Sequence, residues 1–297
     1  MKKLNHHKAL EFWIKNGERK WNLSRLADPE GLSIGLYDDF PPWINRYYAF
    51  FQDLVVDRFL KQIEFSGDGH VLEIGCGSAR WCRKILEWPL KSVTGSDISF
   101  HLLQNSMRFY KNRIGFLNTP ASILPIRSNI LDLVYSITVI HHLPFHVQEV
   151  ALGEIQRVLK HGKSFFIIES TEIGSSSDHL YARSFDNWIK LLEDHNFKII
   201  DAVGQEYIDF RKIIRPVRRL IKPLAVRVMG KGGRDKIVGI DNPEPFNGGF
   251  ESLKLFQRLF HLLFAPLVLA AYPLELALYA TNKARKGHYA CLLSVKK

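Results

Sequence analysis

Short apolar runs alternate with amphipathic stretches through the middle of the chain. Between most of these runs, apolar residues recur at the spacing of a helix. These stretches are Ala79–Glu87, Ser99–Tyr110, Val147–Leu159 and Leu180–His195. Strands alternating with helices predict a parallel sheet with helices on both faces. The runs with the length and composition of strands are His70–Ile74, Ser92–Gly95, Ile114–Leu117, Leu131–Ile137, Ser164–Ile168 and Phe197–Val203.

The regions on either side divide the chain into four parts. Residues 1–65 are rich in aromatic side chains, and helical spacing from Tyr47 to Ile63 predicts an N-terminal helical lid. Residues 66–207 hold the alternating core, and residues 208–286 form a predicted helical insertion. Residues 287–297 contain the apolar run Tyr289–Val295, which predicts a last strand that returns to the core.

Composition places the chain among globular proteins and locates its charge. Hydrophobic residues make up 46% of the 297, and the net charge is +11. Residues 208–297 carry 17 basic and 6 acidic residues, so the whole excess lies there. That excess indicates either a surface for phosphate, an anionic membrane or nucleic acid, or simply solvated basic side chains.

Three cysteines without metal-ligand spacing predict neither a disulfide framework nor a metal site. The sparse cysteines favour a reducing compartment. The basic N-terminus lacks the apolar run of a secretory signal, so we expect a cytoplasmic protein.

A strand that runs into two glycines and then a helix is the sharpest local pattern. Gly75 and Gly77 permit a tight turn, and the helix that follows offers unpaired N–H groups to a carboxylate. Asp97 ends the second predicted strand, where an acid can accept both hydroxyls of a ribose. Arg80 occupies the third glycine position of a dinucleotide fingerprint, which disfavours a nicotinamide oxidoreductase.

Several segments in order resemble the class I S-adenosylmethionine-dependent methyltransferase family, in the group that includes quinone and small-molecule methyltransferases. The resemblance covers about residues 68–170. It implies a doubly wound, mostly parallel, seven-stranded Rossmann-like α/β sheet with an antiparallel last strand, and S-adenosyl-L-methionine as cofactor. The segments are Glu73–Gly77 with Asp97, Ile123–Ile126, Leu131–Val134, Ile140–Leu143 and Glu154–Lys163.

The resemblance also implies roles for single residues. Gly75, Cys76 and Gly77 would face the methionine part of the cofactor, and Asp97 would hold its ribose. The further cofactor-binding residues are Glu73 in the loop segment, Ile98 beside the adenine, Ala121 and Ser122 along the adenine edge, and Ser136 closing the pocket. The family often has an acid before this edge, and here Asn118 or backbone carbonyls would have to replace it.

A hydroxyl acceptor also needs a proton acceptor near the cofactor. His141 and His142 follow the fourth strand, at the carboxyl edge of the sheet where sites of α/β proteins lie. Either can be the general base, since histidine titrates near neutrality, and the alternative is a turn in which one ring packs. Glu169, at the end of the fifth strand, is a further candidate.

The insertion favours contact with lipid. Residues 211–231 hold eight basic residues and no acid, with apolar residues on one helical face, which fits an anionic membrane surface. Residues 259–280 are almost wholly apolar, but His261, Glu275 and two prolines interrupt them. We therefore expect a helical hairpin or an interfacial dip and no true span.

These features together predict methyl transfer to a hydroxyl, or to a carbon, of a lipid-like or lipid-linked acceptor, peripheral to the cytoplasmic face of a membrane. Alternatives are a soluble small-molecule methyltransferase whose insertion is a buried cap or dimer interface, and a non-catalytic cofactor-binding scaffold. Nucleic acid is disfavoured, because Tyr135–Thr138 lacks the Pro-Pro-aromatic pattern that the resemblance implies for base-amino methylation. The oligomeric state is not predicted.

Overall fold

The computed structural model describes residues 42–172, 180–210, 251–281 and 287–297, with five isolated positions: Glu11, Ile14, Lys15, Lys212 and Pro216. Most of the predicted lid and nearly all of the basic stretch 211–231 lie outside the described residues.

Seven strands form one sheet in the order β3-β2-β1-β4-β5-β7-β6. Strands β1 to β5 pair in parallel, and β7 runs antiparallel between β5 and β6. This confirms the expected doubly wound sheet with an antiparallel last strand. The strands are β1 His70–Ile74, β2 Ser92–Asp97, β3 Ile114–Asn118, β4 Leu131–Ile137, β5 Leu159–Ser170, β6 Phe197–Gln205 and β7 Tyr289–Lys296.

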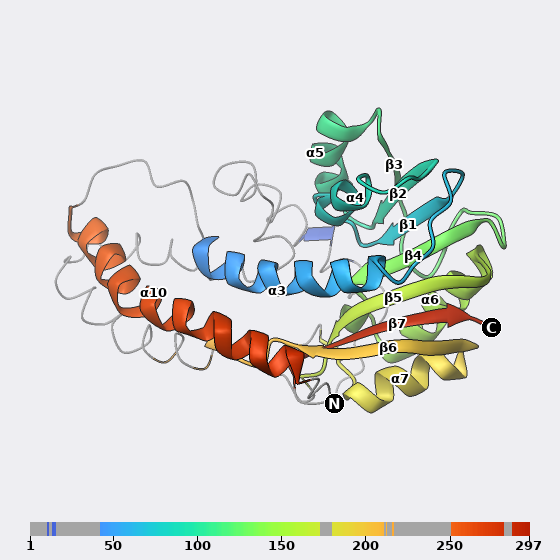
Figure 1. Ribbon diagram of the computed structural model, residues 1–297. Helices are drawn as coiled ribbons and strands as arrows, with labels where there is room; N and C mark the ends of the chain where they lie inside the picture. Colours follow the sequence, from blue (N-terminus) through green and yellow to red (C-terminus); the bar gives the residue numbers. More distant parts are fainter. Residues whose placement is uncertain are drawn as a thin grey trace.

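Helices cover both faces of the sheet (Figure 1). On one face pack α3 (Pro42–Leu60), α4 (Arg80–Ile85) and α5 (Phe100–Tyr110). On the other pack α6 (Phe145–Val158) and α7 (Phe185–Asp194). The amphipathic pattern explains this placement, since the apolar side chains of α7, for example Trp188 and Leu192, are buried against the sheet. All seven residues of β4 are buried, as in a strand covered on both faces.

The structure differs from the sequence prediction at the start of β5. Leu159 is the first residue of the strand and not the last of the preceding helix. Gly162 has φ of 72°, within an irregular stretch where the β4–β5 register shifts. Glycine adopts this left-handed conformation without strain, so the strand continues through the irregular stretch.

The apolar segment 259–280 belongs to one helix, α10 (Glu251–Ala280), so the hairpin expectation is wrong. Pro266 and Pro273 lie inside this helix, and both are exposed. A proline has no N–H to donate to the carbonyl four residues earlier, which here belongs to Leu262 and to Leu269. Both leucines are exposed, so these carbonyls lie on the outer side of the helix. No helix among the described residues is long and apolar enough to cross a bilayer.

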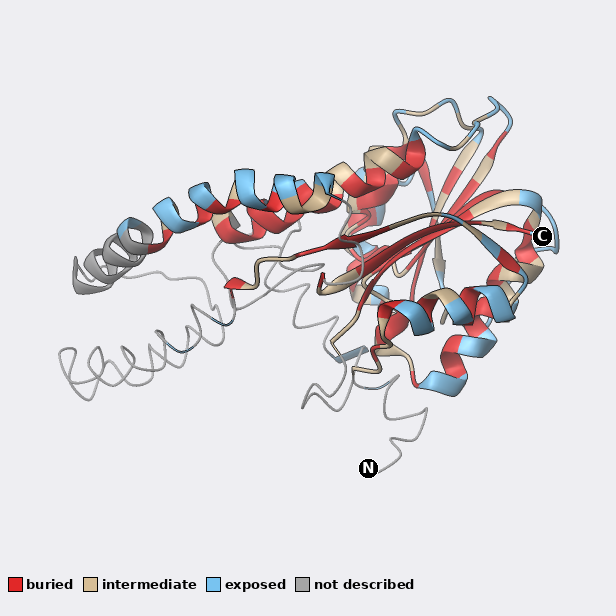
Figure 2. Ribbon diagram, turned by 60° about the horizontal axis from the view of Figure 1, so that its bottom comes forward, coloured by how far each residue is buried: buried red, intermediate tan, exposed pale blue. Residues whose placement is uncertain are grey.

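One side of α10 packs against the protein and the other does not. Phe264, Val268 and Ala271 are buried with aromatic residues of α3 and with Phe210. Figure 2 shows the buried residues along one side of the helix and the exposed residues along the other. The exposed side is apolar, with the side chains of Leu262, Leu267, Leu269, Leu274 and Leu276 between 40% and 71% exposed.

Candidate active site

The loop after β1 needs its glycines. Gly75 and Gly77 have φ of 70° and 50°. A Cβ at Gly75 would lie 2.3 Å from Cγ2 of Val139, which follows β4. Both the backbone conformation and the close approach of the segment after β4 therefore require glycine at residue 75.

Asp97 connects the tip of β2 to this loop. Its carboxylate accepts hydrogen bonds from the backbone N–H of Gly77 at 2.9 Å and of Ser99 at 2.8 Å. Burial raises the pKa of the Asp97 carboxyl, and these two donors oppose the rise. The N–H of Cys76 donates to the carbonyl of Ser96 at 2.9 Å, so two loop amides expected at the methionine end are bonded within the protein.

Asn118 fixes the backbone beside Asp97. Its side-chain amide donates to the carbonyls of Asp97 at 2.9 Å and Ile98 at 3.0 Å. Ile98 follows β2, Ala121 and Ser122 follow β3, and all three are partly exposed. The structure therefore brings the expected ribose and adenine residues to one edge of the sheet, with Asn118 in a supporting role.

Glu73 is buried in β1 beneath the loop, with only 2% of its surface exposed. Its carboxyl accepts a hydrogen bond from the hydroxyl of Tyr135 at 3.1 Å. Burial raises the pKa of Glu73 to about 7, against the lowering effect of hydrogen bonds from Cys82 and Tyr135.

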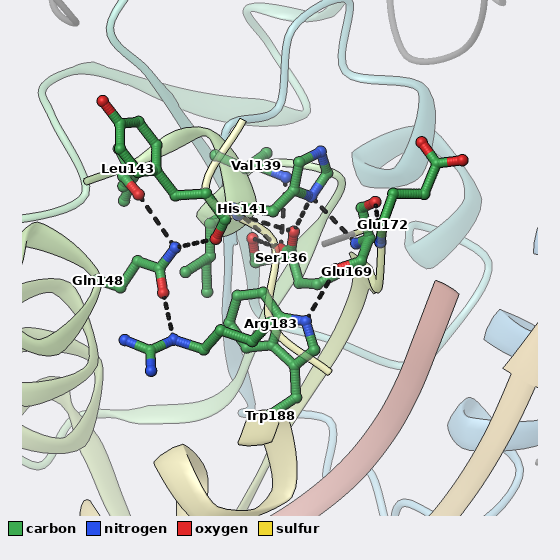
Figure 3. Close-up of polar contacts among 12 residues, drawn as sticks. Ser136, Val139, His141, Leu143, Gln148, Glu169, Glu172, Arg183 and Trp188 are labelled. Carbon is green, nitrogen blue, oxygen red and sulfur yellow. Dashed lines mark hydrogen bonds and ion pairs between the residues drawn. The ribbon is translucent and has the colours of Figure 1, made fainter. Parts of the chain in front are cut away.

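The carboxylate of Glu169 organises the loop that carries both histidines (Figure 3). It accepts hydrogen bonds from the hydroxyl of Ser136 at 3.1 Å and from three successive backbone N–H groups, those of Val139, Ile140 and His141, at 3.0–3.3 Å. Nδ1 of His141 lies 2.5 Å from the same carboxylate. Glu169 is completely buried, so these donors replace its hydration.

The hydrogen bonds decide the tautomer of His141. With the proton on Nδ1, the ring donates to the Glu169 carboxylate, which accepts from four other groups as well. The N–H of Ser170 also lies 3.3 Å from Nδ1, but the 2.5 Å contact is the stronger one. Nε2 is then the basic nitrogen of the ring. The His142 ring lies with its centroid 4.1 Å from that of His141 and is the more exposed of the two.

A second layer of side chains supports this loop. The amide of Gln148 donates to the carbonyls of Leu143 and Tyr181, and Arg183 donates to Gln148 at 2.7 Å. Trp188 donates from Nε1 to the carbonyl of Ser170 at 2.9 Å. The sequence analysis missed these residues, because no local pattern distinguishes them from ordinary helix positions.

Arg80 has a role that its departure from the glycine pattern did not indicate. It donates to the Gln52 side chain at 3.1 Å and to the carbonyl of Ala49 at 3.3 Å, both in α3. Its guanidinium lies 4.1 Å from the ring centroid of Trp81. Arg80 therefore links the helix after the glycine loop to α3.

Residues 72–167 match the methyltransferase domain family. Together with the sheet order, this match supports an S-adenosylmethionine-dependent methyltransferase. An O-methyltransferase of Pyrenophora dematioidea is 24% identical over 249 residues, which are 71% of this chain and 91% of that protein.

One further sequence and one solved structure are similar to the chain. An uncharacterised protein of Methanocaldococcus jannaschii is 28% identical over 135 residues, 44% of this chain and 55% of that protein. Phosphoethanolamine N-methyltransferase 2 of Haemonchus contortus, solved with S-adenosyl-L-methionine, superposes with a TM-score of 0.51 at 17% identity. The superposition covers 82% of this chain and 52% of that chain.

Proposed function

We propose that the chain transfers a methyl group to a hydroxyl oxygen of a lipid-like acceptor at the surface of an anionic membrane. The observation that carries the lipid-like acceptor is the exposed apolar side of α10, since large apolar patches on a protein surface mark interaction sites. The O-methyltransferase relative supports an oxygen acceptor. The basic excess of residues 208–297 supports an anionic surface.

The position of α10 relates this surface to the site. Glu275 of α10 accepts hydrogen bonds from the backbone N–H groups of Tyr207 and Ile208, just beyond the end of β6. Strand β6 ends at the same edge of the sheet as β4, which His141 follows. An acceptor held in a bilayer beside α10 would therefore be next to the edge where the histidines lie.

The residues at this edge fit an adenosyl cofactor. Each carboxylate oxygen of Asp97 accepts one backbone N–H and keeps a lone pair for a ribose hydroxyl. Gly75 and Gly77 let the ligand approach the backbone, Ile98, Ala121 and Ser122 would flank the adenine, and the buried Glu73, Cys76 and Ser136 would support the pocket from behind. When bound, S-adenosylmethionine supplies a methyl group already activated by its sulfonium.

His141 is the proposed general base. Glu169 orients the ring through Nδ1, which leaves Nε2 to take the proton of the acceptor hydroxyl. In this arrangement Glu169 is a positioning residue, because its oxygens are already engaged by five donors.

The direct test is mass spectrometry of a lipid extract incubated with the enzyme and deuterated-methyl cofactor. We expect label in the organic fraction, and a rate loss of about 10²- to 10⁴-fold in His141→Ala with cofactor affinity retained. A rate loss confined to His142→Ala would assign the base to His142 instead.

Two further outcomes would contradict other parts of the proposal. Label found only in the aqueous fraction would contradict the lipid-like acceptor. Unchanged cofactor affinity of Asp97→Asn in calorimetry would contradict the ribose site.

Vesicle flotation tests the membrane surface separately. The wild type should float with phosphatidylglycerol vesicles at low salt and not with phosphatidylcholine vesicles, because both charge and apolar burial contribute. The combined variant Leu262→Ser, Leu267→Ser, Leu269→Ser should not float with the phosphatidylglycerol vesicles and should remain at the bottom of the gradient. Phe109→Ser, which removes an apolar side chain 73% exposed on α5, is the control that should still float. A dimer in light scattering that the triple variant loses would favour a dimer interface over lipid.

A further inference from the structure

One polar residue interrupts the apolar side of α6. The other buried residues of this helix are apolar, and Ala151, Leu152 and Ile155 follow Gln148 at helical spacing. Gln148 itself is completely buried. A buried amide costs free energy unless hydrogen bonds replace its hydration. A side chain that only packed against the sheet could be apolar here, so the amide indicates a further role.

The hydrogen bonds of Gln148 fix the orientation of its amide. Nε2 donates to the carbonyl of Leu143 at 3.0 Å and to the carbonyl of Tyr181 at 2.9 Å. The amide oxygen accepts from Nε of Arg183 at 2.7 Å. An NH₂ group has two protons to donate and both are used, while arginine can only donate, so the amide cannot be reversed. Figure 3 shows Gln148 between Leu143 and Arg183.

These bonds join two segments that lie far apart in the sequence. One is the histidine loop, residues 138–143, which Leu143 ends. The other is the extended segment 180–184, which precedes α7 and contains Tyr181. The N–H of Tyr181 donates to the carbonyl of His141 at 2.6 Å. Segment 180–184 is therefore bonded directly to the backbone of a candidate base.

His141 is held from two directions as a result. Glu169 accepts from its backbone N–H and lies against its ring Nδ1. On the other side Tyr181 donates to its carbonyl, and the carbonyl of Tyr181 is in turn held by Gln148. Gln148 thus contacts neither the ring nor the edge where the cofactor residues lie, but it fixes the segment that holds the backbone of His141.

We propose that Gln148 is a positioning residue for methyl transfer and acts through His141. The inference rests on the proposed function, because it requires His141 as the general base. Proton transfer needs the ring within hydrogen-bond reach of the acceptor hydroxyl. A displacement of about 1 Å by a distant substitution can lower a rate about 10²-fold. Without its amide, Leu143 and Tyr181 lose a donor each, and the histidine loop is no longer fixed against segment 180–184.

Two substitutions separate the donors of Gln148 from its size and from its contact with Arg183. Gln148→Met keeps the length of the side chain and removes all three hydrogen bonds. The ionised side chain of Gln148→Glu keeps an acceptor for Arg183 and removes both donors. In both variants we expect turnover at saturating S-adenosylmethionine to fall about 10- to 100-fold, with the KM for the cofactor unchanged. The rate is the appearance of deuterated methyl in the lipid extract.

Lys296→Met is the matched control. Lys296 is 3% exposed and donates from Nζ to Asn129 and to the carbonyl of Leu159, both at 2.7 Å. Leu159 is the first residue of β5, so these bonds lie at the edge of the sheet opposite to His141. Lys296→Met should lose stability but keep the turnover of the wild type. Equal losses of turnover in Lys296→Met and Gln148→Met would show general destabilisation, and the inference would be wrong.

Hydrogen exchange tests the same inference without an acceptor. The amide of Tyr181 should exchange at least about 10-fold faster in Gln148→Met than in the wild type or in Lys296→Met, because its segment is released. Unchanged exchange at this amide would overturn the inference for any acceptor.

His141→Ala separates this inference from the proposed function. If His141→Ala loses turnover and both Gln148 variants keep it, His141 remains the base and Gln148 does not position it. If His141→Ala keeps turnover, the assignment of the base is wrong and Gln148 has no base to position. Loss of turnover in His141→Ala and in both Gln148 variants, with Lys296→Met unaffected, is the expected result.

Discussion

Glu73 is a carboxyl group buried in the central strands, with a pKa raised to about 7 by that burial. In the unfolded chain the same group titrates near its model value of 4.5. As the pH rises from 4.5 to 7 the unfolded chain loses the proton and the folded chain keeps it. Glu73 therefore lowers the stability of the fold progressively through this window, and the effect is complete above it.

We predict that Glu73→Gln flattens this pH dependence. A pKa shift of this size corresponds to about 3 kcal/mol of unfolding free energy. The wild type should lose this stability between pH 4.5 and pH 8, and the variant should not. Urea unfolding of both proteins at the two pH values measures the difference. Parallel stability curves for the two proteins would contradict a raised pKa at Glu73.

Gly75 offers a second prediction at the residue scale. Gly75→Ala places a Cβ 2.3 Å from the Val139 side chain and forces alanine to a φ of 70°, so we expect a loss of at least about 2 kcal/mol in unfolding free energy. The double variant with Val139→Ala should recover part of that loss, which a double-mutant cycle measures.

Gly153 is the matched control. It is exposed in the middle of α6, and a Cβ there would meet nothing within 4 Å. Gly153→Ala should therefore stabilise the protein by about 0.5–1 kcal/mol. Equal losses in the two alanine variants would show that the contact with Val139 is not the cause.

Only part of the candidate site could be predicted from the sequence. The glycine pair, Asp97 and the two histidines lie next to strand ends that the apolar pattern locates, so their common edge follows from the topology. The partners of Arg80 and the second layer formed by Gln148, Arg183 and Trp188 depend on contacts between distant segments. A single sequence has no periodicity or spacing that indicates such contacts.

At the scale of whole elements, α10 shows how one polar residue can be misread. Glu275 interrupts an apolar run and, with the prolines, suggested a break in the helix. In the structure it is 1% exposed and accepts from Tyr207, Ile208 and the hydroxyl of Tyr47. It joins α10 to the end of β6 and to α3, and burial raises its pKa. The apolar run predicted helical structure, but neither its continuity through the prolines nor the partners of the buried Glu275.

We predict that Glu275→Ala releases α10 from the sheet. The backbone N–H groups of Tyr207 and Ile208 lose their acceptor, which should cost about 2–4 kcal/mol and increase hydrogen exchange at these two amides. Leu274→Ala, at a neighbouring position that is 55% exposed, should change stability by less than about 0.5 kcal/mol. Equal exchange in the two variants would argue against this role of Glu275.

At the scale of the molecule, β7 lies between β5 and β6 and pairs with both. Removing residues 287–297 would leave the facing edges of those two strands without partners and take Cys291, Leu292 and Leu293 from the core. We predict that such a truncated chain loses cooperative unfolding and its near-ultraviolet circular dichroism signal. Removal of Lys297 alone, which lies beyond the strand, should leave both intact. Cooperative unfolding of the longer truncation would show that β7 is dispensable.

The place of β7 also sets an order of events during synthesis. The residues of β6 leave the ribosome more than eighty positions before those of β7, because α10 and the segment preceding it come between. Until Tyr289–Lys296 emerges, β6 lacks the strand with which it pairs among the described residues, and the nascent chain presents two open edges to chaperones and proteases. The slow step in making this enzyme should therefore be the late insertion of one short strand into a sheet that is otherwise already built.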